Sequence, residues 1–230
     1  MNNIQQLVLP TTIPDGVEAW LLKLDLQLPM SNSDFLLLSE VERVRAMSLQ
    51  THADQVRSVA TRAALRRLIA TKVEASANEL RFITNQYGKP YLQGNFSLDF
   101  NVSHAGQYAL IAISTTAQVG VDIENYGRQM DVSALAEYVF THIERQSGSL
   151  SNGDFIKHWV AKESALKAVG RGISEHLQTI SILPSSGNTD YRIESDSQDW
   201  LDIKVWSIQA PNCYAAALAV KSIKPFSMGA

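Results

Sequence analysis

The stretch "SLDFNVSHAGQYALIAIS" at residues 97–114 alternates apolar and polar side chains, passes through small residues and continues as an apolar segment. This pattern predicts a β-hairpin with its turn near residues 105–107. The same plan recurs near the other end of the chain, as "WLDIKVWSIQAPNCYAAALAV" at residues 200–220. The repetition predicts an α+β fold with two similar halves, residues 1–115 and 116–230, and a site at their interface.

Other segments supply the remaining elements. Residues 17–28 alternate as a strand does, and residues 31–47 indicate one helix that begins at a Ser/Asn/Asp cap. Residues 55–75 contain no Gly or Pro and predict another helix. Asp154 is expected to cap a helix that ends at Gly170. A strand is expected at 79–92, interrupted by a turn at 88–90. Further strands are expected at 119–124, 179–183, 191–194, 200–209 and 213–220. A helix is expected near 131–146, followed by a loop at 147–153.

The composition is that of an ordinary soluble globular protein. Of 230 residues, 45% are hydrophobic and 19% are charged. A lone cysteine, Cys213, excludes an internal disulfide framework. The longest apolar runs fall well short of the roughly 20 residues of a transmembrane helix, and the N-terminal stretch lacks the features of a secretory signal. We therefore expect a cytoplasmic location.

The charge is distributed unevenly along the chain. The net charge of −3 argues against a general nucleic-acid binder. Residues 41–90, however, carry nine basic and four acidic side chains, a local charge of +5. A basic region opposite an acidic site favours a compact polyanion together with a metal ion.

Two acids stand close together in "GVDIE" at residues 120–124. On a strand, Val121 and Ile123 would enter a core while Asp122 and Glu124 share the opposite face. Like charges at this distance repel each other, so we expect a positive group nearby. The alternative for this pair alone is a solvated acidic face on an edge strand.

A third acid, Glu163, lies in "WVAKESALKAVGRG" at residues 159–172. It precedes Lys167 by one helical turn, and the alternative for these two residues alone is a surface ion pair worth about 0.3–0.5 kcal/mol. Taken with Asp122 and Glu124, however, it completes a set of three oxygen ligands. Such a set suits Mg²⁺, a hard ion that often shares its coordination sphere with substrate phosphates.

Four fragments in a fixed order carry a family resemblance. They are "YGKP" (87–90), "FNVSHAG" (100–106), "VGVDIEN" (119–125) and "WVAKESALKAVGRG" (159–172). Together they resemble the Sfp-type 4′-phosphopantetheinyl transferases, over roughly residues 57–172. The resemblance implies an intramolecular pseudo-dimer of two α+β halves. It also implies transfer of 4′-phosphopantetheine from coenzyme A to a serine of an acyl, peptidyl or polyketide carrier protein, with release of 3′,5′-ADP.

The resemblance assigns roles to the acids and to the lysine. Asp122, Glu124 and Glu163 would hold Mg²⁺ against the coenzyme A pyrophosphate. Glu163 would also take the serine proton, directly or through a metal-bound water, and a neighbouring metal should depress its pKa. Lys167 would contact the same phosphates.

The remaining implied contacts with coenzyme A come from the first half. His104 and Lys89 would contact the 3′-phosphate and adenosine end, and Ser103 the pyrophosphate. The other implied residues are Arg57 and Arg62 at the phosphorylated ribose, and Gly88 and Pro90 in the turn near the adenine. Arg62 and Arg66 fit the solvated face of a helix equally well.

Two other functions stay open at this point. A serine hydrolase would use Ser103 and His104, but adjacent strand residues point to opposite faces and no G-x-S-x-G motif occurs. A non-catalytic coenzyme A binder would keep the site without transferring anything. The carrier pathway is not fixed by the sequence, and we expect a monomer because two halves within one chain can build the site alone.

Overall fold

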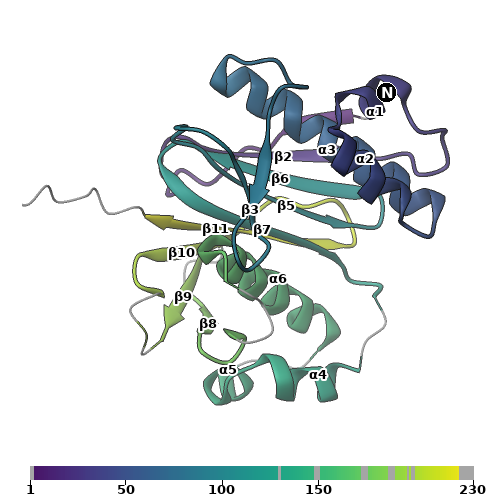
Figure 1. Cartoon of the computed structure of the whole chain (residues 1–230). Helices are drawn as coiled ribbons and strands as arrows, with labels where there is room; N and C mark the ends of the chain where they lie inside the picture. Colours follow the sequence, from purple (N-terminus) through teal and green to yellow (C-terminus); the bar gives the residue numbers. More distant parts are fainter. Residues whose placement is uncertain are drawn as a thin grey trace, which may run out of the picture.

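Two antiparallel sheets form the centre of the computed structural model (Figure 1). It describes residues 3–128, 131–147, 151–171, 176–185, 190–195, 197 and 200–222. The first sheet has the order β1-β2-β6-β5 and contains β1 (Asn3–Gln6), β2 (Val17–Lys23), β5 (Asp99–Ala105) and β6 (Tyr108–Ser114). The second has the order β7-β11-β10-β9-β8 and contains β7 (Ala117–Asn125), β8 (Ser181–Pro184), β9 (Asp190–Glu194), β10 (Ile203–Ser207) and β11 (Tyr214–Ser222).

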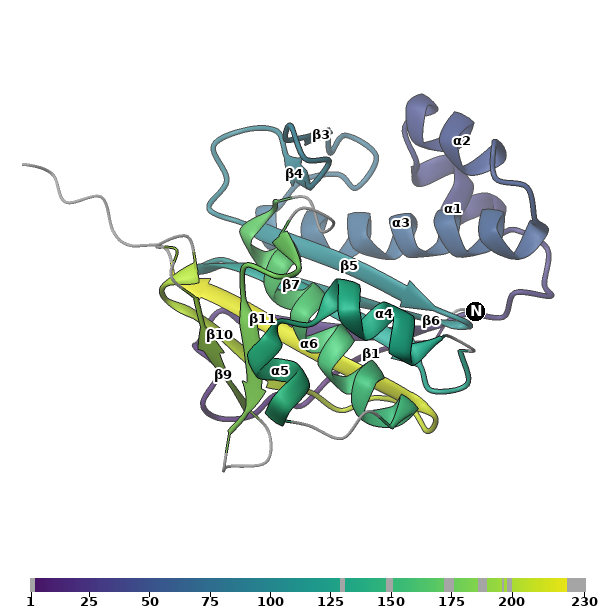
Figure 2. The ribbon, with the colours of Figure 1, turned by 90° about the horizontal axis from the view of Figure 1, so that it is seen from below.

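One long helix covers the outer face of each sheet. Helix α3 (His52–Val73) packs on the first sheet and α6 (Asn152–Val169) on the second, so the layers run helix, sheet, sheet, helix (Figures 1 and 2). A third apolar core fills the space between the two sheets. The smaller elements are α1 (Asn32–Leu37), α2 (Glu40–Met47), α4 (Val132–Val139), α5 (His142–Ser147), and the two-stranded hairpin of β3 (Phe82–Thr84) and β4 (Pro90–Leu92). The predicted α+β fold of two halves is confirmed.

Both predicted hairpins are confirmed, but two predicted helices are each broken in two. The segment 31–47 forms α1 and α2, because Leu38 is extended and buried and Ser39 then begins α2 with a capping box to Glu42. The segment 131–146 forms α4 and α5, which are separated at the extended, buried Phe140. In both cases tertiary burial of one apolar side chain outweighs helix propensity.

Some predicted boundaries also change. The strand predicted at 17–28 ends at Lys23. Helix α6 begins after Ser151, whose hydroxyl accepts the backbone N–H of Asp154 at 3.2 Å, so Asp154 is not the cap. Gly170 ends α6 with φ +72°, as predicted. Within the predicted loop at 147–153, residues 148–150 lie outside the described part of the chain.

The two halves meet along the free edges of their sheets, where β5 lies beside β7. Side chains of alternate β5 residues reach across in place of a backbone ladder. Asp99 Oδ2 accepts the Val119 N–H at 2.7 Å, and Asn101 Oδ1 accepts the Val121 N–H at 2.9 Å. These bonds satisfy backbone donors of β7 and fix its register against β5.

Strand β7 presents opposite faces to two layers. Val121 and Ile123 enter the core between the sheets, as the alternation predicts. Gly120 and Asp122 face α6, which lies directly on the strand at Gly120. An added Cβ there would lie 2.9 Å from the Ala168 Cα and would overlap the Ser164 carbonyl oxygen. Glycine therefore permits the close approach that brings α6 to the acids.

We expect Gly120→Ala to destabilise the protein by about 3 kcal/mol, because the methyl group meets backbone and not a movable side chain. Urea unfolding followed by circular dichroism measures this change. Gly153→Ala is the matched control, since Gly153 lies in α6 with open space at its Cβ position. A Gly120→Ala protein as stable as the Gly153→Ala protein would contradict the close contact.

Candidate active site

A cavity of about 260 Å³ opens at the junction of the two halves. It brings together six of the predicted site residues: Ser103, His104, Asp122, Glu124, Glu163 and Lys167. The first two come from β5, the next two from β7 and the last two from α6. Arg128 and Trp159 also line the cavity, although the sequence analysis did not propose either as a site residue.

The Lys167 ammonium lies at the centre of this group. Its Nζ is 2.6 Å from Asp122 Oδ1 and 3.1 Å from Glu163 Oε2. It also donates to Ser103 Oγ at 3.3 Å, while the Ser103 hydroxyl donates to Asp122 Oδ1 at 2.6 Å. Lys167 is thus a positive group of the kind that the acidic strand led us to expect.

Glu124 has a different cationic partner. Its carboxylate forms an ion pair with Arg128 and also accepts the Asn125 N–H at 3.0 Å. Arg128 is the first basic residue after the acidic strand. This position is the only feature of the sequence that could have predicted its ion pair with Glu124. Each acid of the predicted set is therefore paired with a basic side chain.

Burial sets the protonation behaviour of these groups. It raises the pKa of Glu163 to about 7, and the neighbouring Asp122 charge acts in the same direction, while Lys167 opposes both. Burial alone would lower the pKa of Lys167, but Asp122 and Glu163 outweigh it and raise this pKa. Lys167 is consequently charged at neutral pH.

His104 lines the cavity, and Arg57 lies beside it. The Arg57 Nε donates to the Gly106 carbonyl at 3.1 Å, at the turn that follows His104, and its guanidinium pairs with Asp54. Burial of the ring, followed by the Arg57 charge, lowers the pKa of His104. Since its imidazole is neutral at physiological pH, His104 can both donate and accept a hydrogen bond.

Two family models match most of the chain. One, described as 4′-phosphopantetheinyl transferase, N-terminal, covers residues 31–116, and the other, 4′-phosphopantetheinyl transferase superfamily, covers residues 118–219. The 4′-phosphopantetheinyl transferase HetI of Nostoc sp. is 31% identical over 173 residues, which is 72% of this chain and 73% of HetI. The chain belongs to the 4′-phosphopantetheinyl transferase superfamily. The predicted resemblance is confirmed.

Two further relatives agree with this assignment. The protein slr0495 of Synechocystis sp. is 34% identical over 171 residues, 67% of this transferase and 70% of slr0495. The L-aminoadipate-semialdehyde dehydrogenase-phosphopantetheinyl transferase of Xenopus laevis is 34% identical over 144 residues, 55% of this chain and 47% of the relative. The chain is thus an enzyme that transfers the phosphopantetheine group from coenzyme A to carrier proteins. Among the described residues, no helix has the length and apolar character needed to span a membrane.

Lys89 of the transferase does not line the cavity and has other partners. Its Nζ contacts Asp99 Oδ2 at 2.8 Å, the Val119 carbonyl at 3.2 Å and the Ala168 carbonyl at 3.2 Å. In this arrangement the three N–H donors of the ammonium all have partners within the protein. The predicted contact of Lys89 with the 3′-phosphate stays a prediction. Gly88 and Pro90 form the adjoining turn and the start of β4, and their predicted place near the adenine stays a prediction.

Arg62 also lies apart from the cavity. Its guanidinium stacks over the Phe82 ring, 5.1 Å from the centroid, and shares Glu42 with the buried Arg66. Its predicted contact with the phosphorylated ribose stays a prediction. The other reading, a solvated helix face, is wrong for Arg66, which is 1% exposed.

Internal ion pairs neutralise much of the basic region. The pairs are Arg57–Asp54, Arg62–Glu42, Arg66–Glu42, Arg67–Asp34, Lys72–Glu18 and Lys89–Asp99. The positive charge that the sequence places at 41–90 is therefore largely used within the first half and at its boundary with the second.

The donor set of the cavity suits a hard cation, but its present arrangement does not enclose one. In the described ranges, no group of three acidic, histidine or cysteine side chains is arranged to hold a metal ion. Instead, the carboxylates form ion pairs with Lys167 and Arg128. Metal binding would require these two basic side chains to move aside, after which Asp122, Glu124 and Glu163 offer the hard oxygen ligands that Mg²⁺ prefers.

The geometry gives no support to a serine hydrolase. The Ser103 hydroxyl donates to Asp122 and not to His104, so the pair that would activate a serine nucleophile is not formed. Ser103 instead links the two halves at the acidic strand.

A buried ion pair supports α6 from the side away from the cavity. Lys162 pairs with Glu144 of α5, and both side chains are fully buried. Glu144 also accepts the N–H groups of Thr141 and Ile182 at 2.8 Å each. A buried pair satisfied in this way holds α5 and β8 against the helix that carries Glu163.

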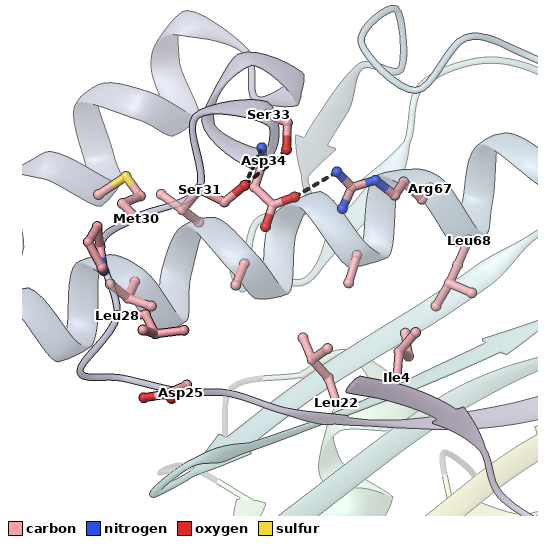
Figure 3. A pocket seen from close by; sticks show the side chains of 15 residues that line it. Ile4, Leu22, Asp25, Leu28, Met30, Ser31, Ser33, Asp34, Arg67 and Leu68 are labelled. Atoms are coloured by element: carbon pink, nitrogen blue, oxygen red, sulfur yellow. Dashed lines mark hydrogen bonds and ion pairs between the residues drawn. The ribbon is translucent and has the colours of Figure 1, made fainter. Parts of the chain in front are cut away.

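A larger cavity, of about 620 Å³, lies elsewhere in the transferase, between β2, α3 and the segment that leads into α1 (Figure 3). Its walls are mostly aliphatic, with an ion pair between Asp34 and Arg67 at 2.6 Å. None of the three predicted acids lines it, so its size does not make it the reaction site.

We expect Lys167→Met to raise the pKa of Glu163 above about 7, because Lys167 is the group that opposes burial there. Carboxyl ¹³C NMR titration measures this value, with the Glu163 signal assigned by its loss in Glu163→Gln. Lys157→Met is the control, since Lys157 lies on the same helix but pairs with Asp154. An unchanged Glu163 pKa in Lys167→Met would contradict the central position of the ammonium.

Proposed function

We propose that this transferase modifies a serine of an acyl, peptidyl or polyketide carrier protein, requires Mg²⁺ and releases 3′,5′-ADP. The observation that carries this proposal is the cavity where three carboxylates, one ammonium and one hydroxyl from both halves meet. Carboxylates and a lysine beside each other are what a reaction on a diphosphate needs, because charge accumulates on phosphate oxygens.

The reaction exchanges one phosphorus–oxygen bond for another. The serine oxygen of the carrier forms a bond to the phosphorus that bears pantetheine. The bond from this phosphorus to the bridging oxygen of the diphosphate breaks, and that oxygen leaves with 3′,5′-ADP. The proton of the serine hydroxyl passes to Glu163, directly or through a water molecule.

Glu163 is suited to accept this proton. Its carboxylate lines the cavity, and burial raises its pKa to about 7 in the absence of a metal ion. Lys167 would donate to phosphate oxygens, while Ser103 and His104 would orient the diphosphate and the adenosine end. Arg57, beside His104, would add positive charge at that end.

Asp122, Glu124 and Glu163 would hold Mg²⁺. The ion would neutralise the negative charge of the diphosphate in the transition state. The monomeric state and the cytoplasmic location stay predictions. Light scattering coupled to size exclusion and cell fractionation test them.

The decisive test is a labelling assay with unmodified carrier proteins. The transferase, coenzyme A and Mg²⁺ are incubated with one carrier each from fatty-acid, polyketide and nonribosomal-peptide synthesis. Mass spectrometry is expected to show a phosphopantetheine adduct on the carrier serine and free 3′,5′-ADP. Tight coenzyme A binding without an adduct on any carrier would instead favour a non-catalytic binder.

We expect Asp122→Asn and Glu163→Gln each to lower the transfer rate by about 100-fold or more, because each removes charge from the set that faces the diphosphate. Rates come from the labelling assay, and circular dichroism checks the fold. Glu194→Gln is the control, as Glu194 lies on β9 and pairs with Arg192. Full activity in Asp122→Asn would contradict the role of this carboxylate.

We also expect Mg²⁺ affinity to rise between about pH 6 and pH 8. With a pKa of about 7, Glu163 is mostly protonated at the lower pH and mostly ionised at the higher one, and only the ionised carboxylate is a ligand. Calorimetry in buffers of different ionisation enthalpy measures both affinity and proton release. Glu163→Gln should show a flatter pH dependence, and equal wild-type affinity at the two pH values would contradict the prediction.

A further inference from the structure

The turn between β3 and β4 reaches from the first half to the C-terminal end of α6 in the second half (Figure 1). At this point Lys89 joins three elements. Its ammonium binds Asp99 of β5, the Val119 carbonyl of β7 and the Ala168 carbonyl in the last turn of α6. Asp99 also accepts the Val119 N–H, so Lys89 and Asp99 together hold both backbone groups of that residue.

Asn85 forms hydrogen bonds both within the turn and to the end of α6. Its side-chain oxygen accepts the N–H groups of Tyr87 and Lys89, each at 2.9 Å. Its side-chain Nδ2 donates across the junction to the Gly170 carbonyl at 3.0 Å. The turn is thus shaped by the same side chain that binds the helix end.

The C-terminal end of α6 is complementary to the turn in charge and in packing. The last carbonyls of a helix have no partners within the helix and carry partial negative charge, which a lysine stabilises. A Cβ at Gly170 would lie 2.9 Å from Lys89 Cδ and 3.3 Å from Asn85 Nδ2, so the two chains are in tight contact. Both the charge and the packing therefore fit Lys89.

This contact lies within one helical turn of Lys167. Ala168 follows Lys167 directly, and the backbone of α6 already lies on Gly120. A shift of the helix end would move Lys167 from its 2.6 Å contact with Asp122. Displacements of about 1 Å can lower a catalytic rate by 100-fold.

We infer that Lys89 is a positioning residue: it binds the C-terminal end of α6 to β5 and β7, and so places Glu163 and Lys167 against Asp122. This inference rests on the proposed function of that site. The alternative role of Lys89 is the predicted contact between its ammonium and the phosphates of coenzyme A.

The test compares Lys89→Met with the wild type in full-length protein. A positioning role predicts that kcat falls by on the order of 10- to 100-fold, while the Kd of 3′,5′-ADP, measured by calorimetry, stays within about 2-fold. Hydrogen exchange should become faster in the last turn of α6. A weakened 3′,5′-ADP affinity with unchanged kcat and unchanged exchange would overturn the inference in favour of a phosphate contact.

Two further variants sharpen the comparison. Lys72→Met removes a lysine that pairs with Glu18 within the first half, and it should leave kcat and exchange in α6 unchanged. Lys89→Arg keeps the charge, yet its planar guanidinium cannot reproduce the three contacts of the ammonium against Gly170, so kcat should stay low. Because arginine binds phosphate well, wild-type kcat and affinity in Lys89→Arg would overturn the inference.

The outcomes also separate this inference from the proposed function. If the wild type labels no carrier, the proposed function fails, and exchange in α6 still tests the contact of Lys89. If the wild type labels a carrier and Lys89→Met matches it in kcat and in exchange, the inference fails while the proposed function stands.

Discussion

The site depends on direct backbone contact between α6 and β7 at Gly120. A helix that packs through side chains stands several ångströms further from a strand, and Lys167 could not then reach Asp122 at 2.6 Å. Asp122 and Glu124 follow Gly120 at every second position of β7. Their carboxylates therefore lie on the face of the strand that packs against α6. One residue without a side chain thus sets the distance between the acids and the lysine.

Charge then determines how the cavity behaves. Two buried carboxylates would repel each other, but Lys167 lies between Asp122 and Glu163 and makes the arrangement stable. Burial still leaves Glu163 with a pKa of about 7, whereas Lys167 keeps its charge. A carboxylate able to gain or lose a proton therefore lies beside a permanent cation, which suits reactions on phosphate groups.

The two halves contribute unequally to this chemistry. The second half supplies the acids and the lysine, while the first supplies a hydroxyl, an imidazole and the polar side chains that hold the junction. Most basic residues of the first half form internal ion pairs. Their role is mainly to hold α3 and its neighbours in place, so the first half serves the site chiefly as a support for β7 and α6.

The sequence by itself determined the α+β class, both hairpins, the inward face of β7 and six of the residues that meet in the cavity. These follow from local periodicity and ordered motifs, which act over a few residues. Only the tertiary structure decided that Leu38 and Phe140 break the predicted helices, since burial outweighs propensity. It also decided the partners of Arg62 and Lys89, because a long basic side chain pairs with whichever acid or carbonyl the folded chain brings near, and sequence spacing does not encode that distance.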